Sequence, residues 1–274
     1  MAISVLTNVT SMLAQSNLGR ATSGLSDSMS RLSSGLRVRS AADDAAGLAI
    51  SEDFKAKIRG LNQARRNAND GVSLAQTADG SLKEIGGMLN RMRELAVQSA
   101  TGTINTSQRG YLNDEFTQLR SEIDRIAATT EFNGVSLLNG GSASGIDFQV
   151  GAGNTTNDRL TLSLATATSA ALSVSTNTIS TASKALSTIS MLDDAITAVS
   201  SRRGTTGAMQ NRLSVTMSNL DTYSTNLEAA NSRIVDVDVA SETARLTKQQ
   251  ILVQAGASML AQANQGPQIA LSLI

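Results

Sequence analysis

The sequence IRGLNQARRNANDGVSLAQTADGSLKEIGGMLNRMRELA, residues 58–96, decides the fold of this chain. Apolar side chains recur in it at intervals of three or four residues, which is the spacing of one face of an α-helix. No proline interrupts the stretch, so it predicts a helix about 60 Å long that packs against other helices like a coiled coil. The apolar positions are Ile58, Leu61, Ala64, Ala68, Val72, Ala75, Ala78, Leu82, Ile85, Leu89, Met92 and Ala96.

Two other segments carry the same periodicity. A shorter helix is predicted around residues 112–126, and a third, longer one begins at about Lys184 and continues to about residue 227. Gly204 and Gly207 could loosen the middle of the third helix, because glycine is a poor helix former. The apolar positions are Leu112, Phe116, Leu119, Ile123 and Ile126, then Ile189, Leu192, Ile196, Val199, Leu213, Met217, Leu220 and Leu227.

Both ends of the chain lack charged side chains, which occur neither in residues 1–19 nor in residues 249–274. The first segment has helical spacing, and in the last segment apolar residues nearly encircle a helix that is expected to stop near Gly266-Pro267. A helix that is apolar on most sides must be buried on most sides, and pairing the two helices covers only one stripe of each.

The remaining apolar area predicts contacts with other molecules, so both ends are interpreted as assembly surfaces. At about 25 cal/mol per Å², covering ~500 Å² would contribute on the order of 10 kcal/mol per helix, before the cost of association. The residues predicted to make polymerisation contacts are Leu6, Val9, Leu13, Leu18, Leu25, Ile251, Leu252, Val253, Met259 and Leu260.

The middle of the chain, residues 131–183, is rich in Gly, Ser, Thr and Ala and nearly free of charge. Residues 146–150 and 160–164 alternate in polarity and predict two strands of a β-hairpin, and the rest is expected to be solvent-facing loop. The predicted class is mainly α, a long antiparallel helical rod with a small β-hairpin tip and both termini together at one end. The expected parts are residues 1–40, 41–130, 131–183, 184–235 and 236–274.

Composition excludes several classes of function. The chain has no histidine and no cysteine, so histidine- and thiol-based catalysis and the common zinc sites are excluded. Its 23 basic and 23 acidic residues balance, which gives no electrostatic reason to bind nucleic acid. The first residues do not read as a Sec signal peptide, and no stretch reads as a membrane span. We therefore predict no catalytic, cofactor-binding or metal-binding residue.

Two acidic pairs have structural interpretations that outweigh catalytic or metal-binding ones. One of Asp43 and Asp44 is expected to cap a helix that starts at Ala45. Asp236 and Asp238 alternate with valines, which favours a strand or an extended linker. Arg37 and Arg39 are expected to pair with Asp43 and Asp44, either within the subunit or across to a neighbour.

Eight short strings, in the same order along the chain, resemble bacterial flagellins. LSSGLR at residues 32–37 runs into ADDAAGLAIS at residues 42–51, which is the family's most recognisable stretch. The others are NDGVSL at 69–74, RELAVQS at 93–99, EFNG at 131–134, NSRI at 231–234, DVD at 236–238, and QA at 254–255 continuing into MLAQAN at 259–264. The resemblance covers nearly the whole chain except the middle.

The resemblance implies a structural subunit that polymerises into the extracellular flagellar filament used for motility. The terminal helices would form an inner tube, the long inner helices a surrounding shell, and the short middle a surface domain. Arg37, Arg39, Asp43, Asp44, Asp236 and Asp238 would lie in the linking region and make contacts within or between subunits. We expect coupled folding and assembly, in which the uncharged ends become helical only when neighbours cover them.

The resemblance also implies partners. They are copies of the same chain, an export chaperone that covers the C-terminal region, the filament cap and the hook-associated junction proteins, with export through the flagellar type III channel as an unfolded chain. Host innate immune receptors recognise many flagellins, and Arg91, Leu95 and Glu115 match that epitope. Arg91, Arg93, Glu94 and Glu115 can also be interpreted simply as a solvated helix face with exposed ion pairs.

Three other functions compete with this interpretation. A hook–filament junction protein has similar ends, but the dense matches at both termini and the short length favour a filament subunit. An enzyme with a catalytic insert would need a larger middle segment and, in its metallopeptidase form, histidine. A cytosolic coiled-coil adaptor would carry charged residues beside its apolar seam at both ends, and none occurs there.

Overall fold

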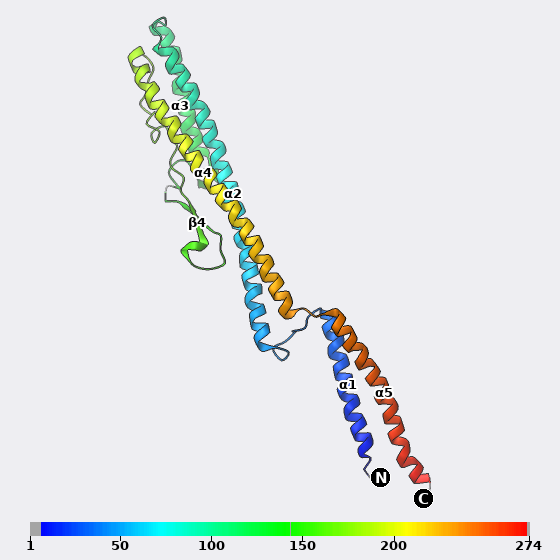
Figure 1. Ribbon diagram of the computed structural model, residues 1–274. Coiled ribbons are helices and arrows are strands. Elements are labelled where there is room, and N and C mark those ends of the chain that lie inside the picture. The colour runs from blue at the N-terminus through cyan, green and yellow to red at the C-terminus, as the bar shows by residue number, and fades with distance from the viewer. Residues whose placement is uncertain (1–6, 143, 273–274) are drawn as a thin grey trace. The chain divides into compact units, whose positions relative to one another are not determined.

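The computed structural model describes residues 7–142 and 144–272, and the predicted polymerisation residue Leu6 lies outside them. The chain forms two compact units. The end unit comprises residues 1–56 and 226–274, and the helical unit comprises residues 57–225. Long helices dominate both units, and two small antiparallel sheets accompany them, so the predicted mainly α class is confirmed (Figure 1). No helix in the described part of the chain is both long and apolar enough to cross a membrane.

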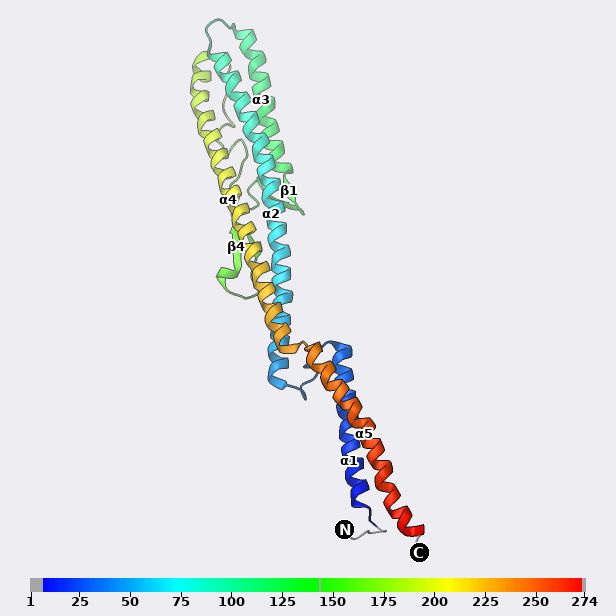
Figure 2. The same ribbon diagram turned by 45° about the vertical axis from the view of Figure 1, so that its right-hand side comes forward.

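The core of the helical unit lies between three helices (Figure 2). They are α3 (Thr106–Thr129) and the parts of α2 (Ala45–Ala100) and α4 (Ala182–Val235) that belong to this unit. The apolar ladder predicted within residues 58–96 is the buried face of α2, and from Ala68 onward it joins the main core. Helix α4 continues without a break through Gly204 and Gly207, so these glycines do not interrupt it. Fully buried side chains include Leu82, Ile85, Leu89, Met92, Leu95, Phe116, Ile123 and Leu192.

Ion pairs join α2 to α4 at positions that match the antiparallel register of the two helices. Arg203 donates to Asp79 over 2.8 Å, and Arg93 donates to Asp193 over 2.6 Å. A third pair joins Arg65 to Asp221 over 3.5 Å. Exposed pairs of this kind contribute little to stability because water screens them, so they select the register of helices that the apolar core holds together.

The two predicted strands pair as expected. β3 (Ile146–Gln149) and β4 (Arg159–Leu162) form an antiparallel hairpin in which Ile146 faces Leu162. The hairpin lies beside α2, where Asn67 donates to the carbonyl of Gln149 over 3.0 Å, rather than beyond the helix ends. A second hairpin, β1 (Glu131–Phe132) with β2 (Val135–Ser136), was not foreseen, although Asn133 and Gly134 between the strands adopt the positive φ angles of a tight turn.

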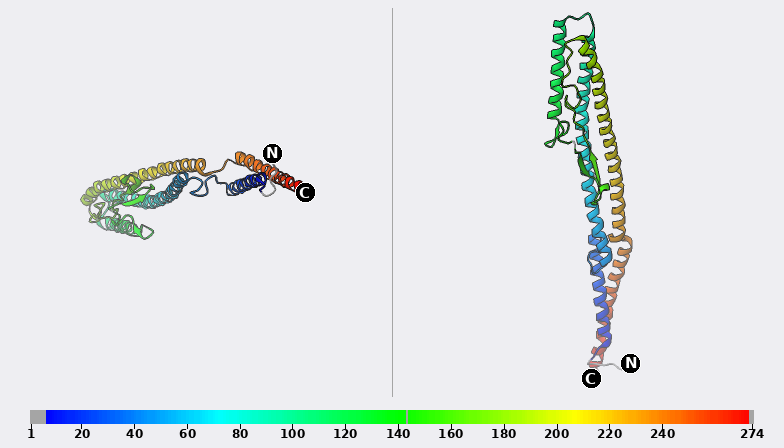
Figure 3. Two further views of the ribbon diagram at one scale, coloured as in Figure 1. Left: turned by 90° about the horizontal axis from the view of Figure 1, so that it is seen from below. Right: turned by 90° about the vertical axis from the view of Figure 1, so that its left-hand side faces the viewer.

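The segment after β2 corrects one expectation, because it is not a solvent-facing loop. It runs alongside the helices and closes over their core (Figure 3), and its buried residues include Leu137, Leu138, Leu164, Val174 and Ile179. Side chains of α3 accept hydrogen bonds from backbone amides of this segment. Asp124 accepts from the amide of Ser169 over 2.7 Å, and Asn113 accepts from the amide of Ile179 over 3.0 Å. Leu164 ends the second predicted strand, but the other buried residues named here have neither helical nor strand spacing, which is why periodicity alone did not reveal their burial.

In the end unit, α1 (Val9–Ser34) and α5 (Val239–Ser272) run antiparallel, side by side (Figure 1). Asn8 and Ala263, 255 positions apart in the sequence, are hydrogen bonded, so the two ends of the chain meet as predicted. Gly35, with a φ of +71°, ends α1 in the left-handed conformation that glycine adopts without strain. Because α5 continues to Ser272, the expected stop near Gly266-Pro267 is wrong.

We predict that Leu89→Ala lowers the free energy of unfolding by about 2–5 kcal/mol, because it opens a cavity in the closed core of the helical unit. The matched control is Leu186→Ala, since Leu186 lies on α4 with 60% of its surface exposed and should change stability by at most ~0.5 kcal/mol. Urea denaturation followed by circular dichroism at 222 nm measures both. Equal losses for the two variants would contradict the assigned core.

Candidate assembly surface

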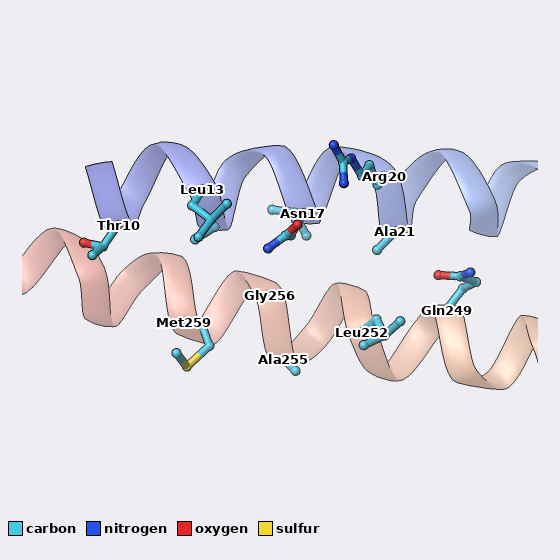
Figure 4. A pocket seen from close by; sticks show the side chains of 12 residues that line it. Thr10, Leu13, Asn17, Arg20, Ala21, Gln249, Leu252, Ala255, Gly256 and Met259 are labelled. Atoms are coloured by element: carbon cyan, nitrogen blue, oxygen red, sulfur yellow. The ribbon is translucent and has the colours of Figure 1, made fainter. Parts of the chain in front are cut away.

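The assembly surface is the apolar face that α1 and α5 leave uncovered. Of the predicted polymerisation residues, Val9, Leu13, Ile251 and Met259 expose between 59% and 70% of their surface, and Leu252 exposes 44%. Leu18, Leu25, Val253 and Leu260 are half-buried. An open groove of about 670 Å³ runs between the two helices (Figure 4), with Leu13 on one side and Leu252 and Met259 on the other. The chain therefore presents most of this set to its surroundings.

Contact between the two helices is close but narrow. Within α1 only Ala21 and Ser28 are buried. Two glycines permit the close approach: a Cβ atom at Gly256 would lie 3.2 Å from Cδ1 of Leu18, and one at Gly24 would lie 2.9 Å from Nε2 of Gln249. A contact this narrow leaves most apolar side chains of both helices exposed or only partly covered by their own subunit.

Asn8 ties the start of α1 to the far end of α5. Its carboxamide oxygen accepts from the amide of Ser11 over 3.1 Å, as an N-cap residue does, and its Nδ2 donates to the carbonyl of Ala263 over 2.9 Å. That carbonyl would normally accept from the residue four positions later, which is Pro267 and has no N–H. Asn8 thus supplies the missing donor where α5 passes through its proline.

The joint, which we define as residues 35–44 and 234–238, connects the helices of the end unit through the backbone. The amide of Arg37 donates to the carbonyl of Val235 over 2.6 Å, and the amide of Val237 donates to the carbonyl of Gly35 over 3.0 Å. Leu36 and Asp236 form a β-bridge, which confirms the extended linker predicted around Asp236.

One residue of each acidic pair in the joint caps a helix. Oδ1 of Asp44 accepts from the amide of Gly47 over 2.9 Å at the start of α2, which confirms the predicted cap. Asp238 does the same for α5, where its Oδ1 accepts from the amide of Ala240 over 3.0 Å. Each carboxylate also meets the positive end of its helix dipole.

Asp43 organises the turn that precedes α2. Its Oδ2 accepts from the amides of Arg39 and Ser40 over 3.2 and 3.1 Å, and its Oδ1 lies 3.5 Å from the guanidinium of Arg31. The hydrogen bond from the Arg39 backbone is the main reason that the pKa of Asp43 is lowered from its usual 3.8. At neutral pH the ionised carboxylate holds the turn closed.

Within the subunit, the guanidinium groups of Arg37 and Arg39 do not form ion pairs with Asp43 or Asp44, so this alternative of the prediction is wrong. Arg37 donates to the carbonyl of Ile234 over 2.6 Å, and Arg39 bonds to Ser30 and lies 3.8 Å from Asp27. The folded turn uses the backbone amide of Arg39 to bind Asp43, which leaves both long side chains free to reach the neighbouring helices.

The three candidate receptor-binding residues are not equally accessible. Arg91 donates to Glu115 and to Glu94, each over 2.9 Å, on an exposed surface of α2 and α3, and these hydrogen bonds, first that to Glu115, raise the pKa of Arg91. This matches the interpretation as a solvated face with ion pairs. Leu95 is fully buried in the core, so it supports this surface from below and is not part of it.

Several residues of the surface were missed in the sequence. Asn8 could have been noticed as a cap residue directly before an apolar helix, and Gly24 and Gly256 as glycines inside helical patterns. Arg31 and Asp27 carry no such signal, because their partners lie on the far side of a turn. Only the folded chain brings these charges together.

Comparisons with known proteins agree on one family. The profile of the bacterial flagellin N-terminal helical region matches residues 5–143, and that of the C-terminal helical region matches residues 189–274. A flagellin of Halalkalibacterium halodurans is 47% identical over 267 residues, covering 97% of this chain and 98% of its own length. The flagellar filament 33 kDa core protein of Treponema phagedenis is 43% identical, with the same coverage of both chains. The crystal structure of Bacillus cereus flagellin is 34% identical and superimposes with a TM-score of 0.51, covering 61% of this chain and 94% of that one.

We predict that the amides of Arg39 and Ser40 titrate with Asp43. The folded-state pKa of this carboxyl is lowered, so its contribution to stability is present above the usual value of 3.8 and is lost as the pH falls through the lower folded-state pKa. Amide chemical shifts in ¹⁵N-labelled protein should show a midpoint below 3.8. Asp43→Asn should abolish the transition and Asp27→Asn should keep it; a wild-type midpoint at or above 3.8 would contradict the assignment.

Proposed function

The chain belongs to the bacterial flagellin family, and from this premise we propose that its subunits polymerise by burying the assembly surface of α1 and α5 against neighbouring copies. Family membership makes the chain a structural subunit of the flagellar filament and not an enzyme. The relatives described above are filament proteins, so the alternative of a hook–filament junction protein is not favoured.

One observation carries the proposal, the exposure of large apolar side chains on the uncharged end segments of α1 and α5. Val9, Leu13, Ile251, Leu252 and Met259 are each between 44% and 70% exposed. Burying such a side chain completely contributes about 1.5–3 kcal/mol, so covering the exposed parts of five contributes on the order of 5–10 kcal/mol. A filament supplies neighbours on several sides, which a dimer does not, and heterologous contacts that do not close produce a helical polymer.

We infer further that folding of the end unit is coupled to assembly. Within α1 only Ala21 and Ser28 are buried, so little apolar burial holds this helix in an isolated subunit. The entropy of ordering each residue opposes helix formation, and helices of this kind depend on packing for most of their stability. In the dilute monomer α1 and α5 open readily, and neighbouring copies stabilise them in the filament.

The parts of the chain take separate places in the proposed filament. Residues 1–40 and 236–274 line the inner tube, residues 41–130 and 184–235 form the surrounding shell, and residues 131–183 lie at the outer surface. The joint, with Arg37, Arg39, Asp43, Asp44, Asp236 and Asp238, links tube to shell. Its backbone hydrogen bonds and caps support this role, because they fix where the chain leaves one helix and enters the next.

Export and partners follow from the family resemblance. We propose that the chain leaves the cell unfolded through the flagellar type III channel, with a chaperone covering its C-terminal region until export. The exposed apolar face of α5 is the reason to propose a chaperone, because an uncovered apolar face would promote association in the cytoplasm. The filament cap and the hook-associated junction proteins would meet the same surface at the two ends of the polymer.

We predict that Leu13→Glu and Ile251→Glu each raise the critical concentration for polymerisation, below which no filament forms, by at least ~100-fold. Burying a carboxylate without a partner costs several kcal/mol, and a ~100-fold change in the critical concentration corresponds to about 3 kcal/mol. Ammonium-sulfate-induced polymerisation, measured by sedimentation and electron microscopy, gives the critical concentration. Leu186→Glu, an equally exposed apolar position on α4, is the control and should polymerise normally. Unchanged polymerisation of both end-unit variants would rule out this surface.

We predict that the exposed ion-pair surface of α2 and α3 binds a host innate immune receptor in the monomer. Arg91→Ala and Glu115→Ala should each weaken binding to immobilised receptor ectodomain by about tenfold, as loss of a charged interface contact does. Arg125→Ala removes another exposed pair, with Glu122 on α3, and should leave binding unchanged. Equal binding by all three variants would exclude the surface.

A further inference from the structure

Methionines are distributed unevenly between exposed and buried positions. Met12, Met29 and Met259, which we call the assembly methionines, expose 66%, 57% and 65% of their surface on α1 and α5. In the helical unit Met92 is fully buried and Met209 is 4% exposed. Met191, on α4, is 43% exposed and provides a reference outside the assembly surface. Among the described methionines, the most exposed therefore lie on α1 and α5, the helices proposed to polymerise.

We propose that the assembly methionines are oxidation sites and that converting them to sulfoxides blocks polymerisation of the free subunit. This inference rests on the proposed function, because it requires that α1 and α5 be covered by neighbouring copies. The modification is reversible, and it acts on the three side chains of the free subunit before assembly.

The chemistry needs a peroxide as the two-electron oxidant. The thioether sulfur attacks one peroxide oxygen, the O–O bond breaks as the S–O bond forms, and water leaves, so that sulfur is oxidised and the peroxide reduced. A dithiol-dependent methionine sulfoxide reductase reverses the step, yielding the thioether, water and a disulfide in the reductase system. The chain contains no cysteine, so no thiol of its own competes for the oxidant.

The position of Met259 shows why a sulfoxide is harmful there. Met259 lies on the α5 side of the groove, across from Leu13 of α1 (Figure 4), in a wall that is mostly apolar. Oxidation turns a flexible apolar side chain into a strong hydrogen-bond acceptor. When a neighbouring copy covers the groove, that acceptor loses its water, and the cost falls on the assembled state alone.

Met12 and Met29 extend the sensitive surface along α1. Met29 lines a shallow groove with Leu25 and polar residues of the same helix, and Met12 is exposed near the uncharged end. Met12 and Met29 lie on α1 and Met259 lies on α5, so α1 contributes two oxidation sites and α5 contributes one. Assembly should shield all three, whereas Met191 should stay equally reactive in subunit and filament.

The experiment treats purified subunits and preformed filaments with the same limited amount of hydrogen peroxide and maps sulfoxides by peptide mass spectrometry. In subunits the assembly methionines and Met191 should oxidise, and Met92 and Met209 should not. In filaments only Met191 of the exposed group should oxidise. Oxidised subunits should show a critical concentration at least about tenfold higher, as expected for a buried polar group without a partner.

Matched variants and repair separate the sites. The triple variant Met12→Leu, Met29→Leu, Met259→Leu should polymerise normally after peroxide treatment, because leucine keeps the volume and cannot be oxidised. Met191→Leu should remain as peroxide-sensitive as the wild type. Independently of any variant, incubation of oxidised wild-type subunits with methionine sulfoxide reductases A and B should restore the original critical concentration.

Two results would overturn the inference: normal polymerisation of wild-type subunits whose assembly methionines are fully converted, or failure of the reductases to restore polymerisation. In both cases the untreated wild type polymerises, so the proposed function survives. If untreated subunits form no filaments, the proposed function is contradicted and the inference fails with it.

Discussion

A single chain cannot cover the apolar surface of its own two terminal helices, and the rest of the structure follows from this constraint. A helix pair shares one contact stripe, and here that stripe is so narrow that α1 buries only Ala21 and Ser28. Glycines at positions 24 and 256 draw the two backbones together, but they add no apolar area. In the assembly that we propose, neighbouring subunits cover what one subunit leaves exposed, and burial of that surface would drive polymerisation.

The helical unit differs from the end unit, because it buries its own apolar core within a single chain. Its three helices and the irregular segment between β2 and α4 enclose fully buried side chains such as Ile85, Phe116 and Ile123. Helix side chains such as Asp124 and Asn113 satisfy the backbone of that segment, so it can lie over the core without leaving polar groups unpaired. Under the proposed coupling of folding to assembly, this unit would fold before neighbours are present, and the end unit would depend on them.

Polar interactions in the joint bury little apolar surface, but they define the path of the chain there. Asp44 and Asp238 each cap the start of a helix, and Asp43 holds the turn that precedes α2 through backbone amides. These bonds use charged acceptors, which are stronger than neutral ones, at positions where four chain segments meet. The two helices with uncharged ends thus meet the start of α2 and the end of α4 in a charged, hydrogen-bonded joint.

By itself the sequence determined the long helices, the β3–β4 pair, the cap at Asp44 and the uncharged ends, because spacing, turn chemistry and charge are local properties. Tertiary structure alone decided the burial of the segment around Leu138 and Val174, the burial of Leu95 beneath the Arg91–Glu115 pair, and the passage of α5 through Pro267. In the last case the deciding group is the carboxamide of Asn8, which donates to Ala263 from the other end of the chain. Local patterns cannot reveal such a donor, since only folding brings residues 255 positions apart within hydrogen-bonding distance.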